Sequence, residues 1–435
     1  MIEINGKHTD AVVQTPDGHD DLLDDMAVEQ IQKMVSHEAF QEPVAIMPDS
    51  HAGSGAVIGF TMPLGNRVCP NTIGVDIGCG VDAVNLGPLP EFDLREADKK
   101  IREAVPFGFE VHDKPIAGFR NMPLEPMDDM LRHFSNEIDE HISHLGYGNF
   151  YIDDLLERVG YDKERAEQSI GTLGGGNHFI EISKSENTDD YWIVVHSGSR
   201  GLGLNIAQYW QNKATEERNG EMETIDYEAI REGFEGKEIE REIERRKAIL
   251  PDPEHVRDTD LDYLEGEEAH GYYIDMLFAQ QYALLNRDKI IREITDALEA
   301  RKKGRHIRSI HNYIDFSDGI MRKGAIKAQT GHHSVIPLNM RDGTLIVEGK
   351  GNEDWNYSAP HGAGRMMSRT RAFNELSVGQ FSREMGGIFS TSVGQSTLDE
   401  SPMAYKPASV IEMAIEPTAE VIDRLTPVLN CKADQ

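Results

Sequence analysis

The chain has 435 residues, of which 39% are hydrophobic and 28% are charged, and its formal net charge at pH 7 is −32. The apolar content suffices for a sizeable core, and the acidic excess argues against broad electrostatic binding of nucleic acid, although it is compatible with a local basic cleft. No apolar run approaches the roughly 18 residues of a membrane span, and the polar start MIEINGKHTD lacks a signal-peptide core, so no membrane contact is expected.

The three cysteines, Cys69, Cys79 and Cys431, do not form a disulfide framework, which makes a reducing cytoplasm the expected compartment. In the first part of the chain, the predicted elements are a strand over Glu42–Asp49, a glycine turn and strand over residues 50–60, a break over Leu86–Glu91, and helices over Asp93–Val105 and Asp128–Gly146. The middle part is predicted to form a glycine turn and strand over Ile170–Ile182, a strand over Tyr191–Arg200 and a helix over Tyr272–Leu298. From His306 we expect short strands, such as Thr344–Glu348, and then a helical tail over Ala408–Leu425 that is broken near Pro417.

These elements interleave without an internal repeat or a low-complexity linker, so we expect one composite domain over residues 1–435. A charged, helical and variable segment is expected at about residues 205–265. Within it, Asp226–Ile249 carries densely mixed charges, which is typical of a solvated helix or a mobile insertion. On the predicted helix over Tyr272–Leu298, apolar residues at helical spacing indicate a core face formed by Ile290, Ile291, Ile294 and Leu298.

The segment NTIGVDIGCGV places the carboxylate of Asp76 three residues before the thiol of Cys79, among glycines. A thiolate suits a borderline-soft divalent cation, and a carboxylate adds a harder oxygen and a negative charge. A buried small cysteine in a glycine-rich turn is the alternative, and these residues alone favour it.

Three histidines stand where apolar strands give way to polar loops: His178 in GGGNHFIEI, His196 in VVHSGSRG and His311 in IHNYIDF. Any one of them alone reads as a hydrogen-bonded core or surface histidine. Together with Asp76 and Cys79 they supply five ligands of types that suit Mn, Zn or Fe. One thiolate bridging two cations would allow a two-metal site, which is a common arrangement in phosphoryl chemistry.

The motif SAPHGAGRMMSRTR sets His361 among glycines and is followed by Arg365, Arg369 and Arg371. Guanidinium groups suit phosphate oxygens, and an exposed imidazole beside them could attack phosphorus and hold a phosphoramidate. A glycine turn leading into a basic helix is the alternative interpretation. The segments Arg322–Ala325 and Ser197–Gly201 add basic groups beside glycines that could cradle anions, whereas Walker-type, GxGxxG, GxSxG and HExxH motifs are absent from the sequence.

The order of these motifs resembles the RtcB family of GTP-dependent RNA ligases from Met47–His51 to the C-terminus. The motifs that carry the resemblance are MPDSH, VDIGCG, GTLGGGNHFIE, HSGSRG, HNY, RKGA, GNE, HGAGRMMSR and PMAYK. The resemblance implies an α/β (α+β) fold in which β-sheets with surrounding helices enclose a central metal-lined cleft. It also implies an enzyme that joins RNA ends bearing a 2′,3′-cyclic phosphate or a 3′-phosphate to 5′-hydroxyl ends, in tRNA splicing or RNA repair.

The same resemblance implies the cofactors and the roles of particular residues. It implies two Mn²⁺ ions held by Asp76, Cys79, His178, His196 and His311, with Cys79 bridging, and a transient bond between His361 and the GMP of GTP. Arg200 would meet an RNA phosphate. The implied GTP contacts are Asn177, Glu181, Asn312, Gly362, Ala363, Gly364 and Lys432. A monomer is expected, and an accessory activating protein is compatible with the resemblance.

The chain departs from the family pattern at two places. Many members carry Gly-Ser-Met-Gly after the Ile-Pro step, where this chain has Leu338-Asn339-Met340-Arg341 in the implied nucleotide pocket. Members commonly end in Lys-Gly, whereas Lys432 is followed here by Ala433-Asp434-Gln435. Two alternatives stay open: a metal-dependent phosphoesterase that opens cyclic phosphates without ligation, and a non-catalytic protein that binds RNA ends.

Overall fold

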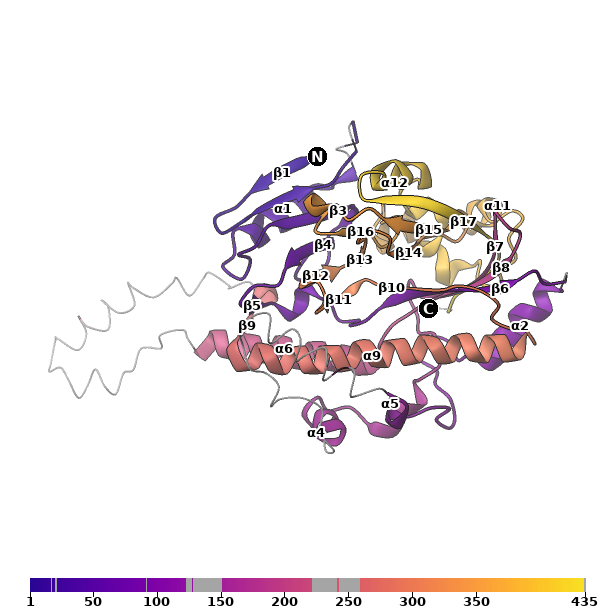
Figure 1. Cartoon of the computed structure of the whole chain (residues 1–435), viewed down its shortest axis with the longest axis horizontal. Helices are drawn as coiled ribbons and strands as arrows, with labels where there is room; N and C mark the ends of the chain where they lie inside the picture. Colours follow the sequence, from indigo (N-terminus) through magenta and orange to yellow (C-terminus); the bar gives the residue numbers. More distant parts are fainter. Residues whose placement is uncertain are drawn as a thin grey trace.

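Two large sheets and one long helix form the framework of the molecule, for which we analysed a computed structural model (Figure 1). It describes residues 1–433 except residues 17, 20–21, 91, 123–126, 128–150, 221–240 and 242–258. The predicted helix over Asp128–Gly146 and, apart from residue 241, the charged segment Asp226–Ile249 therefore lie outside the described residues. Among the described helices, none is long and apolar enough to cross a bilayer.

Every strand pair within the two large sheets is antiparallel except β2 with β3. The six-stranded sheet runs β1 (Ile2–Asn5), β2 (Asp10–Val13), β3 (Val44–His51), β4 (Ile58–Pro63), β12 (Ile320–Lys323) and β11 (Asn312–Asp315). The seven-stranded sheet runs β10 (His306–Ile310), β6 (Gly80–Gly87), β8 (Tyr191–Ser197), β7 (Phe179–Ser185), β17 (Ala419–Cys431), β15 (Gly343–Gly349) and β14 (His333–Asn339).

Two small sheets and the helices complete the described structure. The small sheets pair β13 (Ala325–Lys327) with β16 (Ser358–Pro360) and β5 (Arg67–Val68) with β9 (Leu264–Glu265). The α-helices are α1 (Asp25–Val35), α2 (Leu94–Ala104), α4 (Tyr151–Arg158), α5 (Lys163–Gln168), α6 (Arg200–Gly220), α9 (Gly266–Ala297), α10 (Arg369–Glu375), α11 (Val378–Glu384) and α12 (Ala408–Ile415).

The long helix α9 confirms the predicted helix and its apolar face. It lies beneath the seven-stranded sheet, where it packs on β8, α2 and α6 (Figure 1). Ile290, Ile291 and Ile294 are fully buried in one core cluster, and Leu298 packs against that cluster while partly exposed. The predicted α/β class is also confirmed, because strands and helices share each of the larger cores.

The alternation of antiparallel strands brings four strand ends together. β6 and β7 begin where β8 and β10 end, with Gly80 opposite both Ser197 and Ile310, and Phe179 opposite His196. After β10 the chain passes through His311 into β11 of the other large sheet. The sequence positions that carried the predicted ligands therefore meet where the two sheets join.

The prediction of a helical tail over Ala408–Leu425 was wrong in its second half. Helix α12 ends at Ile415, and after Pro417 the chain forms β17, which extends to Cys431. β17 pairs on both sides, with β7 and with β15, so its backbone hydrogen bonds come from distant segments that local periodicity does not reveal. The 21-residue helix α6, which begins at Arg200, was not identified from the sequence apart from the general expectation of helix near residue 205.

A fully buried guanidinium fastens α9 to the strands that surround this junction. Arg287 donates from Nε to Asp82 Oδ1 on β6 at 2.7 Å, and from Nη1 to the backbone oxygens of Gly78 and Ser197, each at 2.9 Å. Both side chains of the Arg287–Asp82 pair are 0% exposed. Burial alone would raise the pKa of Asp82, but Arg287 and His306 hold it below its usual value, so the carboxylate stays charged.

We expect Arg287→Met to lower the free energy of unfolding by about 3–5 kcal/mol, because it removes one partner of a buried ion pair and leaves Asp82 in the interior. Denaturant unfolding followed by circular dichroism measures the loss. Arg292→Met is the matched control, because Arg292 lies five residues further along α9 and is exposed. Equal stability of the two variants would contradict this role for Arg287.

Candidate active site

The Gly-Cys-Gly step lies in a tight loop pressed against α9. Gly78 has φ +73°, and a Cβ atom there would lie 2.7 Å from the Cα of Gln280, so only glycine fits. The loop directs Cys79, which is 3% exposed, toward the ends of β8 and β10. Asp76 in the same loop accepts hydrogen bonds at Oδ1 from the backbone N and the Oγ of Ser199, at 3.0 and 3.3 Å.

The five predicted metal ligands converge around Cys79: the ligand atoms of Cys79, His178 and His196 all lie within 4.8 Å of one another. Asp76 and His311 each contact one of these two histidines. We divide the five into two groups of three that share Cys79. In the first group, His178 Nε2 lies 3.1 Å from Asp76 Oδ2 and 3.4 Å from Cys79 Sγ. In the second group, His196 Nε2 lies 3.3 Å from Cys79 Sγ and 3.4 Å from His311 Nε2. Of the histidines that the sequence proposed as ligands, none lies away from this cluster.

The electrostatics of the cluster fit a cation. Burial lowers the pKa of His196 and of His311 well below the usual histidine value, so both imidazoles are neutral and can donate a lone pair. His178 Nδ1 bonds the backbone oxygen of Leu173 at 3.0 Å, which leaves its Nε2 directed at the cluster. His311 Nδ1 is buried without a hydrogen-bond partner among the described residues.

Burial raises the pKa of both acidic members, Asp76 and Cys79, but their neighbours shift the two pKa values in opposite directions. Burial disfavours the Asp76 carboxylate, but the hydrogen bond and charge of His178 outweigh that effect and place its pKa below the usual aspartate value. Burial and the adjacent Asp76 raise the pKa of the Cys79 thiol, so a thiolate here requires a compensating positive charge. Sulfur, imidazole and carboxylate together can hold divalent transition metals.

His361 stands next to the cluster and is held by a buried carboxylate. Its Nδ1 lies 2.7 Å from Oδ2 of Asp49, which is 0% exposed, and its ring centroid lies 4.7 Å from that of His311. Gly364 has φ +72°, and a Cβ there would lie 2.2 Å from the backbone oxygen of Asp49, so glycine lets the two segments touch. The Asp49 bond occupies Nδ1 and leaves Nε2 as the nitrogen with a reactive lone pair.

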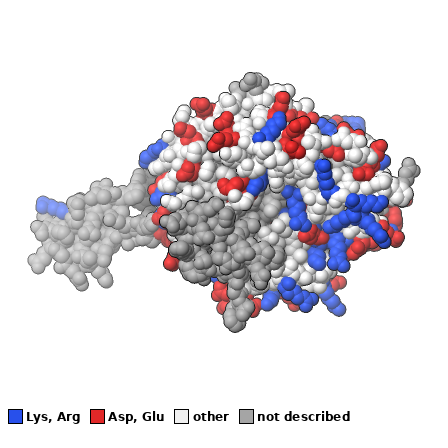
Figure 2. Space-filling view, viewed as in Figure 1, with Lys and Arg blue, Asp and Glu red and all other residues white. Residues whose placement is uncertain are grey.

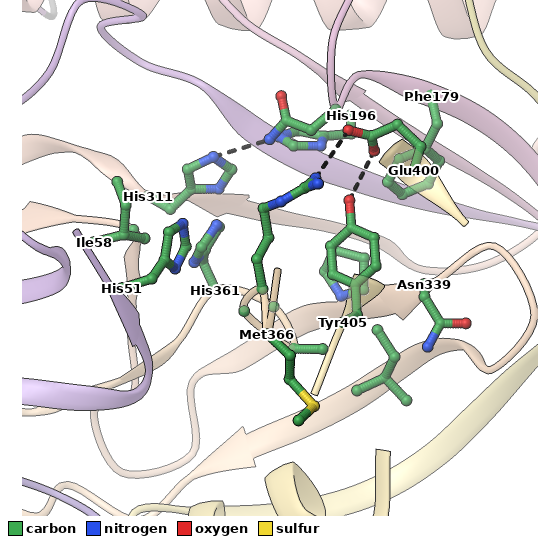
Figure 3. A pocket seen from close by; sticks show the side chains of 18 of the residues that line it. His51, Ile58, Phe179, His196, His311, Asn339, His361, Met366, Glu400 and Tyr405 are labelled. Carbon is green, nitrogen blue, oxygen red and sulfur yellow. Dashed lines mark hydrogen bonds and ion pairs between the residues drawn. The ribbon is translucent and has the colours of Figure 1, made fainter. Parts of the chain in front are cut away.

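His361 and every member of the cluster except His178 line one pocket of about 590 Å³. In Figure 3 the rings of His51, His311 and His361 stand on one side of it, and Glu400 and Tyr405 stand on the other. The pocket is lined by all the residues predicted to contact the nucleotide, namely Asn177, Glu181, Asn312, Gly362, Ala363, Gly364 and Lys432. Leu338, Asn339 and Met340 of the departing loop line it as well, whereas Arg341 pairs with Asp342 at 2.7 Å and with Glu384.

Lys432 and Glu181 reach the pocket from neighbouring strands. Lys432 Nζ bonds Glu400 Oε2 at 2.9 Å and the backbone oxygen of Asn177 at 3.2 Å. Burial alone would raise the pKa of Glu400, but Lys432 and Arg369 hold it at about 2.

Burial raises the pKa of Glu181 to about 7, against the opposing hydrogen bonds from Ser183 and Asn430. Asn312 links the loop at Asp76 to Gly324. Its Nδ2 donates to the backbone oxygen of Asp76 at 3.2 Å, and its Oδ1 accepts from the backbone N of Gly324 at 3.1 Å.

The arginines proposed as phosphate contacts fall into two sets. Arg365 and Arg369 line the pocket, where each contacts Glu400 at 3.3 Å. Arg371 is exposed on α10 and pairs with Glu375 at 2.8 Å. Arg200 lies outside the pocket lining and donates to Thr172 Oγ1 at 2.9 Å and to the backbone oxygen of Gly108 at 2.6 Å, so its role toward RNA stays a prediction.

Sequence reasoning missed the residues that hold the predicted site residues in position. Asp49 lies within MPDSH and Lys406 within PMAYK, and both motifs had been noticed without a role for these side chains. Lys406 Nζ, also buried, donates to the backbone oxygens of Pro48 and Ser50, each at 2.9 Å, and so braces the strand that carries Asp49. Glu400 had no signal in the sequence, because only the fold brings it to Lys432.

Comparison with known proteins finds relatives over most of the chain. A family model described as "tRNA-splicing ligase RtcB" matches residues 30–433. The chain is 32% identical over 415 residues to the "RNA-splicing ligase RtcB" of Escherichia coli K12, covering 89% of this chain and 90% of that protein. It is 26% identical over 453 residues to the "tRNA-splicing ligase RtcB" of Aeropyrum pernix, covering 88% and 86% of the two chains.

We expect Cys79→Ala to lose bound divalent metal, because each group of ligands would then keep only two members. Metal content after equilibrium dialysis against Mn²⁺ or Co²⁺ measures the effect. Cys69→Ala is the control, because Cys69 is equally buried but bonds the backbone oxygen of Asp260. Retention of the full metal content by Cys79→Ala would contradict a shared thiolate ligand.

Proposed function

The chain belongs to the RtcB family of tRNA-splicing ligases, and we propose that it joins RNA ends bearing a 2′,3′-cyclic phosphate or a 3′-phosphate to 5′-hydroxyl ends. Such an activity serves tRNA splicing or RNA repair. One observation carries the proposal: four of the five proposed metal ligands, Asp76, Cys79, His196 and His311, line the same pocket as a histidine oriented by a carboxylate. The fifth, His178, contacts Asp76 and Cys79. One catalytic domain is part of the proposal, because the residues that line the pocket extend from Asp24 to Lys432.

Two metal ions, which we propose to be Mn²⁺, fit the two groups of ligands. Asp76, Cys79 and His178 would hold one, and Cys79, His196 and His311 the other. When bound, the ions would withdraw charge from phosphate oxygens and keep Cys79 as a thiolate. Cys79 is therefore assigned to binding metal and not to attacking substrate, in keeping with its burial.

His361 is the proposed nucleophile toward GTP. Its Nε2 attacks the α-phosphorus and forms a P–N bond, while the bond to the β-phosphate oxygen breaks and pyrophosphate leaves. Asp49 keeps the proton on Nδ1 and stabilises the charge that develops on the ring, as a carboxylate does for a catalytic histidine. Asn177, Glu181, Asn312, Lys432 and the backbone of residues 362–364 are the proposed nucleotide contacts.

The RNA steps follow from the phosphoramidate. Water first opens a cyclic end to a 3′-phosphate, an oxygen of which then attacks the phosphorus on His361, and the P–N bond breaks. The RNA then carries GMP on its 3′-phosphate, so attack by the 5′-hydroxyl forms the new phosphodiester and releases GMP. Arg200 is proposed to meet an RNA phosphate, which requires it to exchange its bond to Thr172 or to Gly108.

The decisive assay supplies α-labelled GTP, Mn²⁺ and two RNAs, one ending in a cyclic phosphate and one beginning with a 5′-hydroxyl. We expect a joined product that requires GTP, and labelled protein in the absence of RNA. His361→Ala should abolish both, whereas His333→Ala, at a histidine that pairs with Glu348 at 3.0 Å outside the pocket lining, should keep both. Opening of the cyclic phosphate with neither GTP use nor joining would instead support the phosphoesterase alternative.

A further inference from the structure

A dense group of cations lies at the C-terminal end of α9, in a chain whose net charge is −32. The segment that follows the helix, RKKGRHIR over residues 301–308, contains Arg301, Lys302, Lys303, Arg305 and Arg308, and all five are exposed. Figure 2 shows Lys and Arg side chains gathered on this end of the visible face, where Figure 1 places α2, β10 and the end of α9. We call residues 301–305 the basic loop.

The cations of the basic loop differ from those of the pocket in having no acidic partner. Among the described residues, no carboxylate pairs with Arg301, Lys302, Lys303 or Arg305, whereas the pocket's Arg369 and Lys432 both contact Glu400. A helix C-terminus attracts positive charge, but that effect is weak at exposed positions and is confined to the last turn. It does not account for four cations within the five residues 301–305 that have no carboxylate partner in the described part of the chain.

A surface hollow adjoins the basic loop. Its volume is about 500 Å³, and three cations line it: Lys289 and Arg292 on α9 and Lys302 in the loop. The one carboxylate in its lining, Asp288, is bound by Arg308 at 2.6 Å. Arg292 has only a 3.7 Å contact with Asp296 along the helix, between two exposed side chains. The hollow is therefore a net positive concavity suited to phosphate oxygens.

Two structural elements connect this hollow with the metal-ligand cluster. On the inner face of the same turn of α9, Asn286 accepts hydrogen bonds from the backbone N of Gly171 and Thr172 at 2.7 and 3.1 Å, in the loop that leads to His178. The strand β10 leads from the basic loop to His311, over five residues or about 17 Å. The basic loop is therefore one strand length away from the cluster, which places both within reach of one polynucleotide chain.

We propose that the basic loop and the adjoining hollow bind the phosphodiester backbone of the RNA substrate, away from the ends that are joined. This inference rests on the proposed ligase function, because RNA is the polyanion that function brings to the chain. It also offers an answer to the conflict between an acidic chain and an RNA substrate, because four cations without a carboxylate partner among the described residues stand within five residues of sequence.

The test compares Lys302→Glu/Lys303→Glu with Lys7→Glu/Lys350→Glu, which makes the same change of net charge at exposed lysines elsewhere. The probes are a long hairpin RNA and a tetranucleotide, both ending in a 3′-phosphate. For the basic-loop variant we expect about tenfold weaker binding of the hairpin, with a salt dependence of log K reduced by about 1–2. Tetranucleotide joining and GTP labelling of the protein should stay at the wild-type level.

Unchanged hairpin binding by the basic-loop variant would overturn the proposal and would favour an acidic protein as the occupant. The proposal would also be overturned by an equal loss of hairpin affinity in the control variant, or by equal losses of affinity for the hairpin and the tetranucleotide. Lys302→Gln/Lys303→Gln should show the same hairpin-specific loss to a smaller degree, which separates removal of attraction from added repulsion. Failure of the ligase function itself would look different, because the wild type would then neither join RNA ends nor be labelled by GTP. Hairpin binding would still test the basic loop in that case.

Discussion

The buried Arg287 guanidinium is the interaction on which the arrangement of the site depends. It joins α9 to Asp82 on β6 and to the backbone oxygens of Gly78 and Ser197, which are adjacent to Cys79 and His196 in the chain. A charge in the interior is costly unless its partners are fixed, so the pair constrains the helix and both strands to one position. The preceding residue, Asn286, fixes the loop that leads to His178, so one turn of α9 sets the position of three ligands.

Arg287 and Asn286 thus position a site in which Cys79 and His361 have different proposed roles, metal binding and nucleophilic attack. Cys79 is buried between two groups of ligands, where burial and Asp76 raise its pKa and make a bound cation the condition for its charge. His361 lies beside the cluster, but its partner is Asp49, so its free nitrogen faces the pocket. In the proposed mechanism, metal binding and nucleophilic attack therefore belong to different side chains that lie close together.

Most of the site residues could be proposed from the sequence, because each strand-end motif marks one ligand in a distinctive glycine-rich context. Their convergence could not be derived from spacing, since it depends on β10, β6, β8 and β7 pairing side by side, which brings their ends together. Asp49, Glu400 and Lys406 were missed because they act through partners more than thirty residues away or on backbone oxygens. β17 was mistaken for helix for the same reason: its stability comes from two neighbouring strands and not from its own residues.

The central claim is that one buried thiolate, Cys79, is shared by two metal ions. Anomalous scattering from crystals grown with Mn²⁺ tests it most directly, because it locates each ion relative to the sulfur without reference to activity. The account predicts two peaks about 3.5–4 Å apart, one beside Asp76 and His178, the other beside His196 and His311, and both within bonding distance of Cys79 Sγ. A single peak, or two peaks of which one lies away from Cys79, would contradict it.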